Sequence, residues 1–133
     1  MTPPNAAHVA DAARAGRTAL RLAALLTGVG TLHFLVPKSF DAIIPAELPG
    51  SPRAYTYASG VAELTTAGLL MTPRTRRLGG AVAAALFLAV FPANVNMVRL
   101  WWDKPWPMRL AVIARLPLQI PLITAALQVS RSS

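Results

Sequence analysis

Seven polar side chains interrupt otherwise apolar stretches of this sequence, and their types are those that bind small molecules or transfer protons. They are His33, Ser59, Glu63, Asn94, Asn96, Arg115 and Gln119. Inside a membrane, an ionisable group costs at least ~2.5 kcal/mol on insertion scales, so it usually faces the interior of a helix bundle and has a partner. Glu63 and Arg115 carry opposite charges, and we expect them to form such a pair.

Two interpretations of these residues stay open. A pair formed by Glu63 and Arg115 can bind a ligand or handle protons, or it can simply fix the register between two helices. His33 can bind a ligand or act as an interfacial hydrogen-bonding residue. It is the only histidine within an apolar stretch, so one chain cannot supply two axial haem histidines.

The chain has no cysteine. This excludes disulfides, thiol redox cycling, and ligation of zinc or iron–sulfur clusters by thiolates of this chain. We expect no metal site, and a redox role requires a bound cofactor or a partner protein. The residues identify no catalytic group.

The composition is that of a membrane protein. Hydrophobic residues make up 54% of the 133 residues and charged residues only 14%, whereas a soluble domain carries about 25% charged residues. The net charge of +8 does not indicate a nucleic-acid partner, because the basic residues lie between apolar stretches, as in cytoplasmic loops of membrane proteins. The partner that we expect is the lipid bilayer.

Four apolar stretches of about twenty residues predict four transmembrane helices, each roughly 30 Å long. The stretches cover residues 18–36, 54–71, 78–98 and 108–129, after a flexible lead-in over 1–17 and before a tail over 130–133. The predicted fold class is therefore all-α, an integral membrane four-helix bundle in one domain. A signal peptide is an alternative for the first stretch, although no small-x-small cleavage site follows it.

The loops predict how the bundle lies in the membrane. Seven basic residues flank the ends of the chain and the turn at 74–77, against five on the opposite side, which places both termini in the cytoplasm of a cell-membrane protein. The loop at 99–107 contains three tryptophans, which we expect to anchor it at the headgroup level. The proline-rich loop at 38–53 contains apolar residues, and we expect it to lie on the membrane surface or to fold over the bundle mouth.

With this topology the polar side chains of all four helices lie in the outer half of the bundle. Glu63 and Arg115 lie at one depth, ~14 Å below the outer surface. Small residues flank Glu63 on its helix, which suits close approach of a neighbouring helix. Asn94 and Asn96 are two residues apart, so on a regular helix they cannot face the same way.

Three prolines interrupt the predicted third and fourth helices. Pro92, Pro117 and Pro121 each remove a backbone donor and leave a carbonyl without its helical partner. Free carbonyls near polar side chains are typical of helices that line a cavity. We therefore expect a small-molecule pocket in the outer half.

Four stretches of the chain resemble the DoxX-like family of small four-helix membrane proteins. The resemblance runs from about Gly28 to Leu127 and rests on "GTLHFLVPKSFDAIIPAELP", "YASGVAELTTAGLLMTPRTRRLGG", "AVFPANVNM" and "RLPLQIPLI". It implies a redox- or quinone-linked membrane protein, since family members are linked to thiosulfate:quinone oxidoreduction and to resistance to quinones or oxidative stress. By this likeness, Glu63, the segment with Asn94 and Asn96, and the segment from Arg115 to Gln119 match the polar motifs of the family. The lack of cysteine argues against a thiol-based sulfur reaction.

Three functional hypotheses follow. The first is a redox-linked membrane subunit that takes up a quinone or another small apolar molecule, and that works with a membrane or redox protein partner. The second is a non-catalytic accessory or scaffold subunit of a larger complex, or a homo-oligomer, which docks through small-residue faces such as Gly79 and Gly80. The third is a small transporter, for which four helices would require dimerisation.

Overall fold

The computed structural model describes residues 5–133, and all regular structure within this range is helical. The elements in chain order are α1 (Ala6–Leu35), α2 (Pro37–Asp41), α3 (Pro52–Met71), the 3-10 helix η1 (Pro73–Thr75), α4 (Arg76–Ala89), α5 (Phe91–Leu100) and α6 (Trp106–Ser132). Three segments are long and apolar enough to cross a membrane, namely Ala6–Leu35, Pro73–Leu100 and Trp106–Ser132. This all-α chain therefore has the character of a membrane protein, and α3 is not among the three segments.

Helix α1 begins well before the first predicted stretch. Asn5 caps it, since its side chain accepts a hydrogen bond of 2.7 Å from the backbone N–H of His8, and a cap of this type satisfies an unpaired donor of the first turn. Alanines follow, and alanine is the strongest helix former. Most of the lead-in predicted over 1–17 is consequently helical, while residues 1–4 lie outside the described residues.

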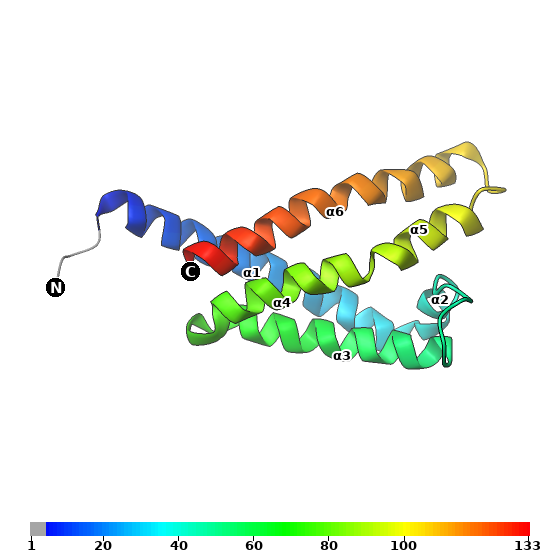
Figure 1. The fold of residues 1–133 in the computed structure, drawn as a ribbon, viewed down its shortest axis with the longest axis horizontal. Helices are drawn as coiled ribbons and strands as arrows, with labels where there is room; N and C mark the ends of the chain where they lie inside the picture. The colour runs from blue at the N-terminus through cyan, green and yellow to red at the C-terminus, as the bar shows by residue number, and fades with distance from the viewer. Residues whose placement is uncertain (1–4) are drawn as a thin grey trace.

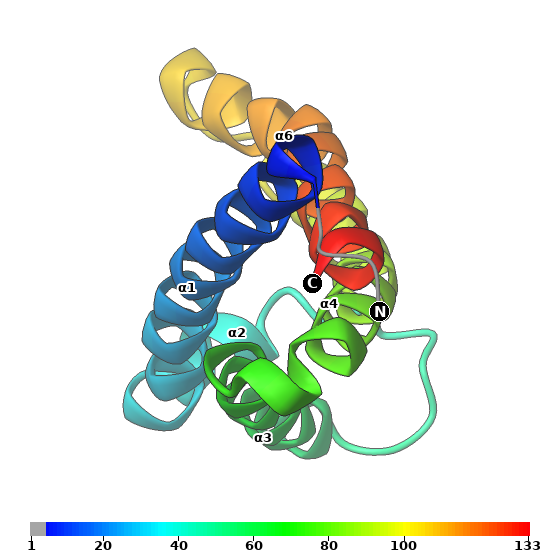
Figure 2. The ribbon, with the colours of Figure 1, turned by 90° about the vertical axis from the view of Figure 1, so that its left-hand side faces the viewer.

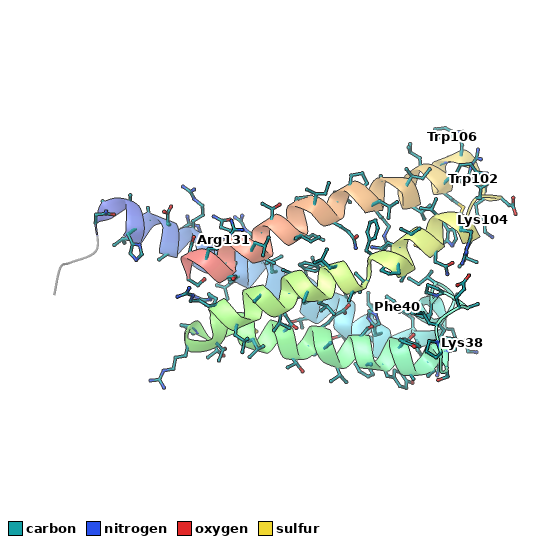
Figure 3. The ribbon with its side chains drawn as sticks, viewed as in Figure 1. Lys38, Phe40, Trp102, Lys104, Trp106 and Arg131 are labelled. Carbon is teal, nitrogen blue, oxygen red and sulfur yellow. The ribbon has the colours of Figure 1, made fainter. Side chains whose placement is uncertain are left out.

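The long helices form a ring of four neighbours. Helix α1 packs beside α3 and α6, and α4 packs beside the same two helices. Both termini and the turn at η1 lie at one end, and α2 and the loop between α5 and α6 lie at the other (Figures 1 and 2). We call these the basic end, which includes Arg131, and the tryptophan end, which includes Trp102 and Trp106 (Figure 3).

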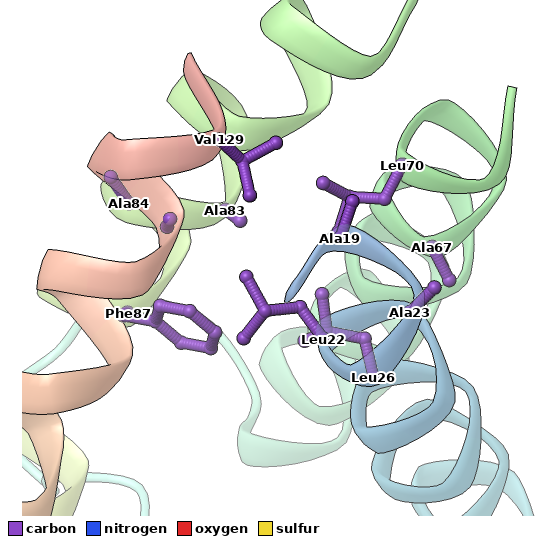
Figure 4. Packing of buried hydrophobic residues seen from close by; sticks show 11 residues of the cluster. Ala19, Leu22, Ala23, Leu26, Ala67, Leu70, Ala83, Ala84, Phe87 and Val129 are labelled. Atoms are coloured by element: carbon purple, nitrogen blue, oxygen red, sulfur yellow. The ribbon is translucent and has the colours of Figure 1, made fainter. Parts of the chain in front are cut away.

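The hydrophobic core fills the bundle toward the basic end (Figure 4). Small and branched side chains from all four long helices form it: Ala19, Leu22, Ala23, Leu26, Ala67, Leu70, Ala83, Ala84, Phe87, Ala126 and Val129. The buried hydroxyl of Thr66 donates to the carbonyl of Ala62 at 2.6 Å, so it adds no unpaired polar group. The bundle is thus closed at this end by apolar packing.

Two glycines allow α4 to approach its neighbours in this core. A Cβ atom at Gly79 would lie 2.9 Å from the backbone nitrogen of Leu70 on α3, and one at Gly80 would lie 2.6 Å from that of Ser130 on α6. Both glycines are buried inside the bundle. Our expectation that they form an external docking face is therefore wrong, because the chain uses this face for its own packing.

The predicted third stretch is divided at Val90. Pro92 stands in the first turn of α5 and cannot donate a backbone hydrogen bond, so α4 ends at Ala89 and α5 starts anew at Phe91. Helix α6, in contrast, stays continuous through Pro117 and Pro121. Beyond the break, the α5–α6 pair diverges from α1 and α3 toward the tryptophan end (Figure 1).

Candidate functional site

A cavity of about 260 Å³ occupies the half of the bundle toward the tryptophan end. Most of its lining residues are apolar, and they come from α1, the segment after α1, the kink between α4 and α5, and α6: Leu25, Leu26, Val29, Phe40, Ile43, Ile44, Phe87, Val90, Ala93, Leu118 and Leu122. The remaining lining residues are polar. The cavity thus has the form of an apolar chamber with a few placed polar groups, which is typical of small-molecule sites.

Six of the seven polar residues singled out in the sequence line this cavity. They are His33 on α1, Ser59 and Glu63 on α3, Asn94 on α5, and Arg115 and Gln119 on α6. The structure therefore brings together one or two polar side chains from each side of the ring. Thr56 joins them from α3, and the sequence patterns did not single it out.

The contact between α1 and α3 sets the position of His33 and Glu63. A Cβ atom at Gly30 would lie 3.2 Å from the Cβ of Glu63, and one at Gly60 would lie 3.0 Å from the Cβ of His33. The two backbones are this close because neither glycine has a side chain. As a result, the Nδ1 atom of His33 lies 3.3 Å from the Oε2 atom of Glu63.

The hydrogen on Nδ1 of His33 points to a backbone carbonyl and not to Glu63. Nδ1 lies 2.8 Å from the carbonyl oxygen of Val29, one turn earlier in α1, and a carbonyl can only accept, so Nδ1 is the donor. The ring also stacks on Phe40 with 3.8 Å between centroids. The Oε2 atom of Glu63 is consequently buried with no hydrogen-bond partner among residues 5–133.

The expected pair between Glu63 and Arg115 does not form. Within residues 5–133 the ion pairs join Arg53 to Asp41 and Arg99 to Glu47, and the basic side chain that lies beside Glu63 is that of His33. Helices α3 and α6 are both flanked by α1 and α4, so they stand diagonally in the ring, and equal depth does not bring their side chains into contact. Arg115 instead donates to the sulfur of Met97 on α5 at 3.2 Å.

Gln119 contributes a second unsatisfied acceptor. Its Nε2 atom donates to the carbonyl oxygen of Phe87 at 3.3 Å, which joins α6 to the end of α4. Its Oε1 atom is buried and has no hydrogen-bond partner in the described part of the chain. Buried polar atoms without partners are rare in proteins, and each one calls for an explanation such as a ligand or a water molecule.

Asn96 is the one predicted residue that lies outside the cavity. It donates from Nδ2 to the carbonyl oxygen of Ile43 at 3.0 Å and accepts a hydrogen bond from Arg99. Arg99 also reaches Glu47 at 3.3 Å. Asn94 and Asn96 therefore face different ways, as their spacing predicts, and Asn96 holds the loop rather than lining the pocket.

The segment 37–51 folds over the mouth of the cavity, and we call it the cap. Phe40, Ile43 and Ile44 point their apolar side chains into the cavity from the cap, and Phe40 marks its place at the tryptophan end in Figure 3. Of the two positions expected for this loop, the structure has the one over the bundle mouth. The sequence signal was the presence of apolar residues in a proline-rich loop, but it did not identify which of them line the pocket.

The cap is fixed to α3 through Asp41. The Asp41 carboxylate accepts hydrogen bonds from Thr56 Oγ1 at 2.6 Å and from Arg53 Nε at 2.8 Å. The Thr56 hydroxyl and the Arg53 guanidinium lower the pKa of Asp41 from its ordinary value of 3.8. Asn96 and Arg99 of α5 bind the other side of the cap. The cap is therefore attached to two walls of the cavity, α3 and α5.

The chemistry of the cavity suits an organic molecule better than a metal ion. No three His, Asp or Glu side chains gather at a metal-binding distance within residues 5–133. The walls offer apolar contacts, two unpaired acceptors on Glu63 and Gln119, and the guanidinium of Arg115. A small molecule with an apolar body and polar head fits this arrangement.

Residues 22–130 match the protein family described as "Domain of unknown function (DUF8561)". The matched region contains the C-terminal part of α1, all of α2 to α5 and most of α6, and with them every cavity residue. No curated protein and no solved structure matches the chain.

Proposed function

We propose that this chain, which belongs to the DUF8561 family, is a redox-linked membrane protein that binds a quinone or a similar small apolar molecule in its cavity. The observation that carries the proposal is the apolar cavity of about 260 Å³ into which all four sides of the bundle contribute buried polar groups. A bundle that needed only stability would fill this space with side chains, because packed interiors leave few voids larger than water.

The redox part of the proposal rests on the DoxX-like sequence motifs. Four polar residues of these motifs, Glu63, Asn94, Arg115 and Gln119, line the cavity, whereas Asn96 does not. A quinone head is a flat ring with two polar oxygens, and its size and polarity fit a chamber whose polar groups stand on different helices. Without cysteine in the chain, electrons would pass to and from the bound molecule through a partner protein.

We further propose that the chain crosses the cell membrane four times, with both termini in the cytoplasm. Helices α1 and α4 run in the same direction from the basic end (Figure 1), so the chain must return between them, and α3 is the segment that does so. The exposed face of α3 carries apolar residues, namely Val61, Leu64 and Met71. The larger number of basic residues at the basic end supports a cytoplasmic location for it.

The test is to purify the protein gently in native lipid and to identify the small molecules and proteins that accompany it by mass spectrometry. We expect a bound quinone, which Glu63→Gln and Arg115→Ala lose. The matched controls are Asp103→Asn and Arg74→Ala, which remove a carboxylate and a guanidinium outside the cavity and should retain the molecule.

A contrary outcome would be equally informative. If a single partner complex accompanies the protein in fixed stoichiometry and neither the original chain nor its controls contain a small molecule, the quinone proposal is wrong. The protein would then be an accessory subunit of that complex, and its polar residues would serve helix packing.

A further inference from the structure

The unpaired polar atoms of the cavity are both side-chain oxygens, and the oxygens of an ionised carboxyl group and of an amide accept hydrogen bonds. Glu63 and Gln119 are each only 5% exposed, and Glu63 Oε2 and Gln119 Oε1 lack partners among residues 5–133. They come from α3 and α6, the two helices that stand diagonally across the ring. A molecule in the cavity therefore meets an acceptor on each of two opposed walls.

Three of the donors that line the cavity are already engaged with the protein. His33 Nδ1 donates to Val29, Gln119 Nε2 donates to Phe87, and Thr56 Oγ1 donates to Asp41. These groups cannot turn to the two acceptors without breaking a bond to the backbone or to the cap. Ser59, Asn94 and Arg115 also line the cavity and carry donors, but within residues 5–133 none of them bonds to Glu63 Oε2 or Gln119 Oε1. A molecule that fills the cavity can supply the donors that these two atoms lack, and the oxygens of either redox form can accept from the free donors of the wall.

This requirement distinguishes the two redox forms of a quinone. The oxidised form has two carbonyl oxygens, which only accept, and it would leave both Glu63 Oε2 and Gln119 Oε1 unpaired. The reduced form has two hydroxyl groups on opposite sides of the ring, and each can donate. Water filling the empty cavity can also donate, and a ligand that cannot reproduce the hydrogen bonds of the water it displaces loses affinity.

We propose that the cavity selects the reduced, hydroxyl-bearing form of its ligand, a hydroquinone or a related phenol, over the oxidised quinone. This inference rests on the proposed function, because it names the form of the molecule bound at the same site. Each donor lost against a buried acceptor weakens binding by roughly tenfold to a hundredfold. A tenfold preference for the reduced form raises the two-electron midpoint potential of the bound couple by about 30 mV.

The experiment compares three probes that share one tetramethyl-substituted ring, on the protein in lipid nanodiscs without oxygen. The probes are tetramethylhydroquinone, its dimethyl ether and tetramethylbenzoquinone, and their affinities are measured by isothermal titration calorimetry. The ether keeps the ring and oxygens but cannot donate, so it separates hydrogen bonding from redox chemistry. We expect the hydroquinone to bind at least about tenfold more tightly than the other two.

A pair of variants on α6 assigns the effect to the acceptor. Gln119→Leu removes the unpaired oxygen and should reduce the preference for the hydroquinone by roughly tenfold. Gln128→Leu makes the same change on the same helix outside the cavity, and should leave the preference unchanged. The comparison of probes on the original chain stands even if Gln119→Leu folds poorly.

The possible outcomes distinguish this inference from the proposed quinone-binding function. Equal or tighter binding of the quinone or the ether, abolished by Arg115→Ala, overturns the preference for the reduced form and leaves the quinone site in place. Binding of none of the three probes overturns both. Tight hydroquinone binding that Gln119→Leu weakens supports both.

Discussion

Replacing Gly80 by alanine should separate two helices at the closed end of the bundle. The added Cβ atom would lie 2.6 Å from the backbone nitrogen of Ser130 and 2.7 Å from the carbonyl oxygen of Ala126. Both contacts are with the backbone of α6, so no side chain can rotate away to make room. Carbon atoms rest about 3.5–4.0 Å from their non-bonded neighbours, and α6 must therefore move by about 1 Å.

The size of the effect follows from a comparison with a second glycine. Overpacking of this kind costs about 1–3 kcal/mol, while the change from glycine to alanine within a helix gains up to about 1 kcal/mol. At Gly68 on α3 a Cβ atom would meet nothing within 4 Å, so Gly68→Ala keeps the gain without the clash. The difference in unfolding free energy between the two variants is then about 1–3 kcal/mol, with the propensity term cancelled.

The assay is reversible unfolding in mixed detergent micelles, followed by circular dichroism of the helices. We expect Gly80→Ala to unfold at a lower denaturant fraction than the original chain, and Gly68→Ala at the same or a higher fraction. Equal unfolding free energies for the two variants would show that α4 and α6 are not in backbone contact at Gly80, and the ring order of the helices would have to be revised.

Two further predictions concern the cap and the kink. The folded environment lowers the pKa of Asp41 from 3.8. The stabilisation that the ionised Asp41 gives to the folded cap is therefore fully present above pH 3.8, and it is lost as the pH falls through the lowered pKa. A spin label on Ser39→Cys, on the exposed side of the cap next to Asp41, should therefore become mobile only below pH 3.8, whereas adding Asp41→Asn should make it mobile at pH 7. Pro92→Ala restores a helix donor and should straighten the segment, so that labels on Leu78→Cys and Leu100→Cys move apart toward ~33 Å, the length of 22 helical residues. An unchanged distance between them would mean that packing, and not the proline, bends the helix.

The helical content and most of the cavity residues could be predicted from local features. Apolar stretches of about twenty residues locate helices with little ambiguity. Polar residues such as His33, Glu63 and Gln119, each inside such a stretch at a similar depth, had to meet in one region of a small bundle. The structure shows that they line a common cavity. Ligand binding by these residues remains a prediction.

The errors arise from relations between helices that depth does not determine. Glu63 and Arg115 line the same cavity, yet the order of the helices around the ring puts them on diagonal elements. The side chain that lies beside Glu63 is that of His33, because the backbones of α1 and α3 approach closely at Gly30 and Gly60. A pattern within one helix indicates that a close contact exists, but it does not identify the helix across the contact.

The cap shows a second limit of predictions made from local sequence patterns. Asn96 was grouped with the cavity because it lies near Asn94, but it binds the backbone of Ile43, which is 53 residues away. Such a contact depends on where a loop without regular structure comes to rest. Only the apolar residues of the loop indicated that it would cover part of the bundle.

The one-sided closure of the bundle determines what kind of work the protein can perform across a membrane. The core between Ala19 and Val129 is packed with aliphatic and aromatic side chains, and no chain of polar groups leads through it among the described residues. A proton or molecule that reaches Glu63 must return through the half from which it came. If the protein binds a redox-active ligand as we propose, protons taken up and released in the cavity would cross the same side of the bilayer. Such a reaction would change the redox state of the ligand pool without moving protons across the membrane.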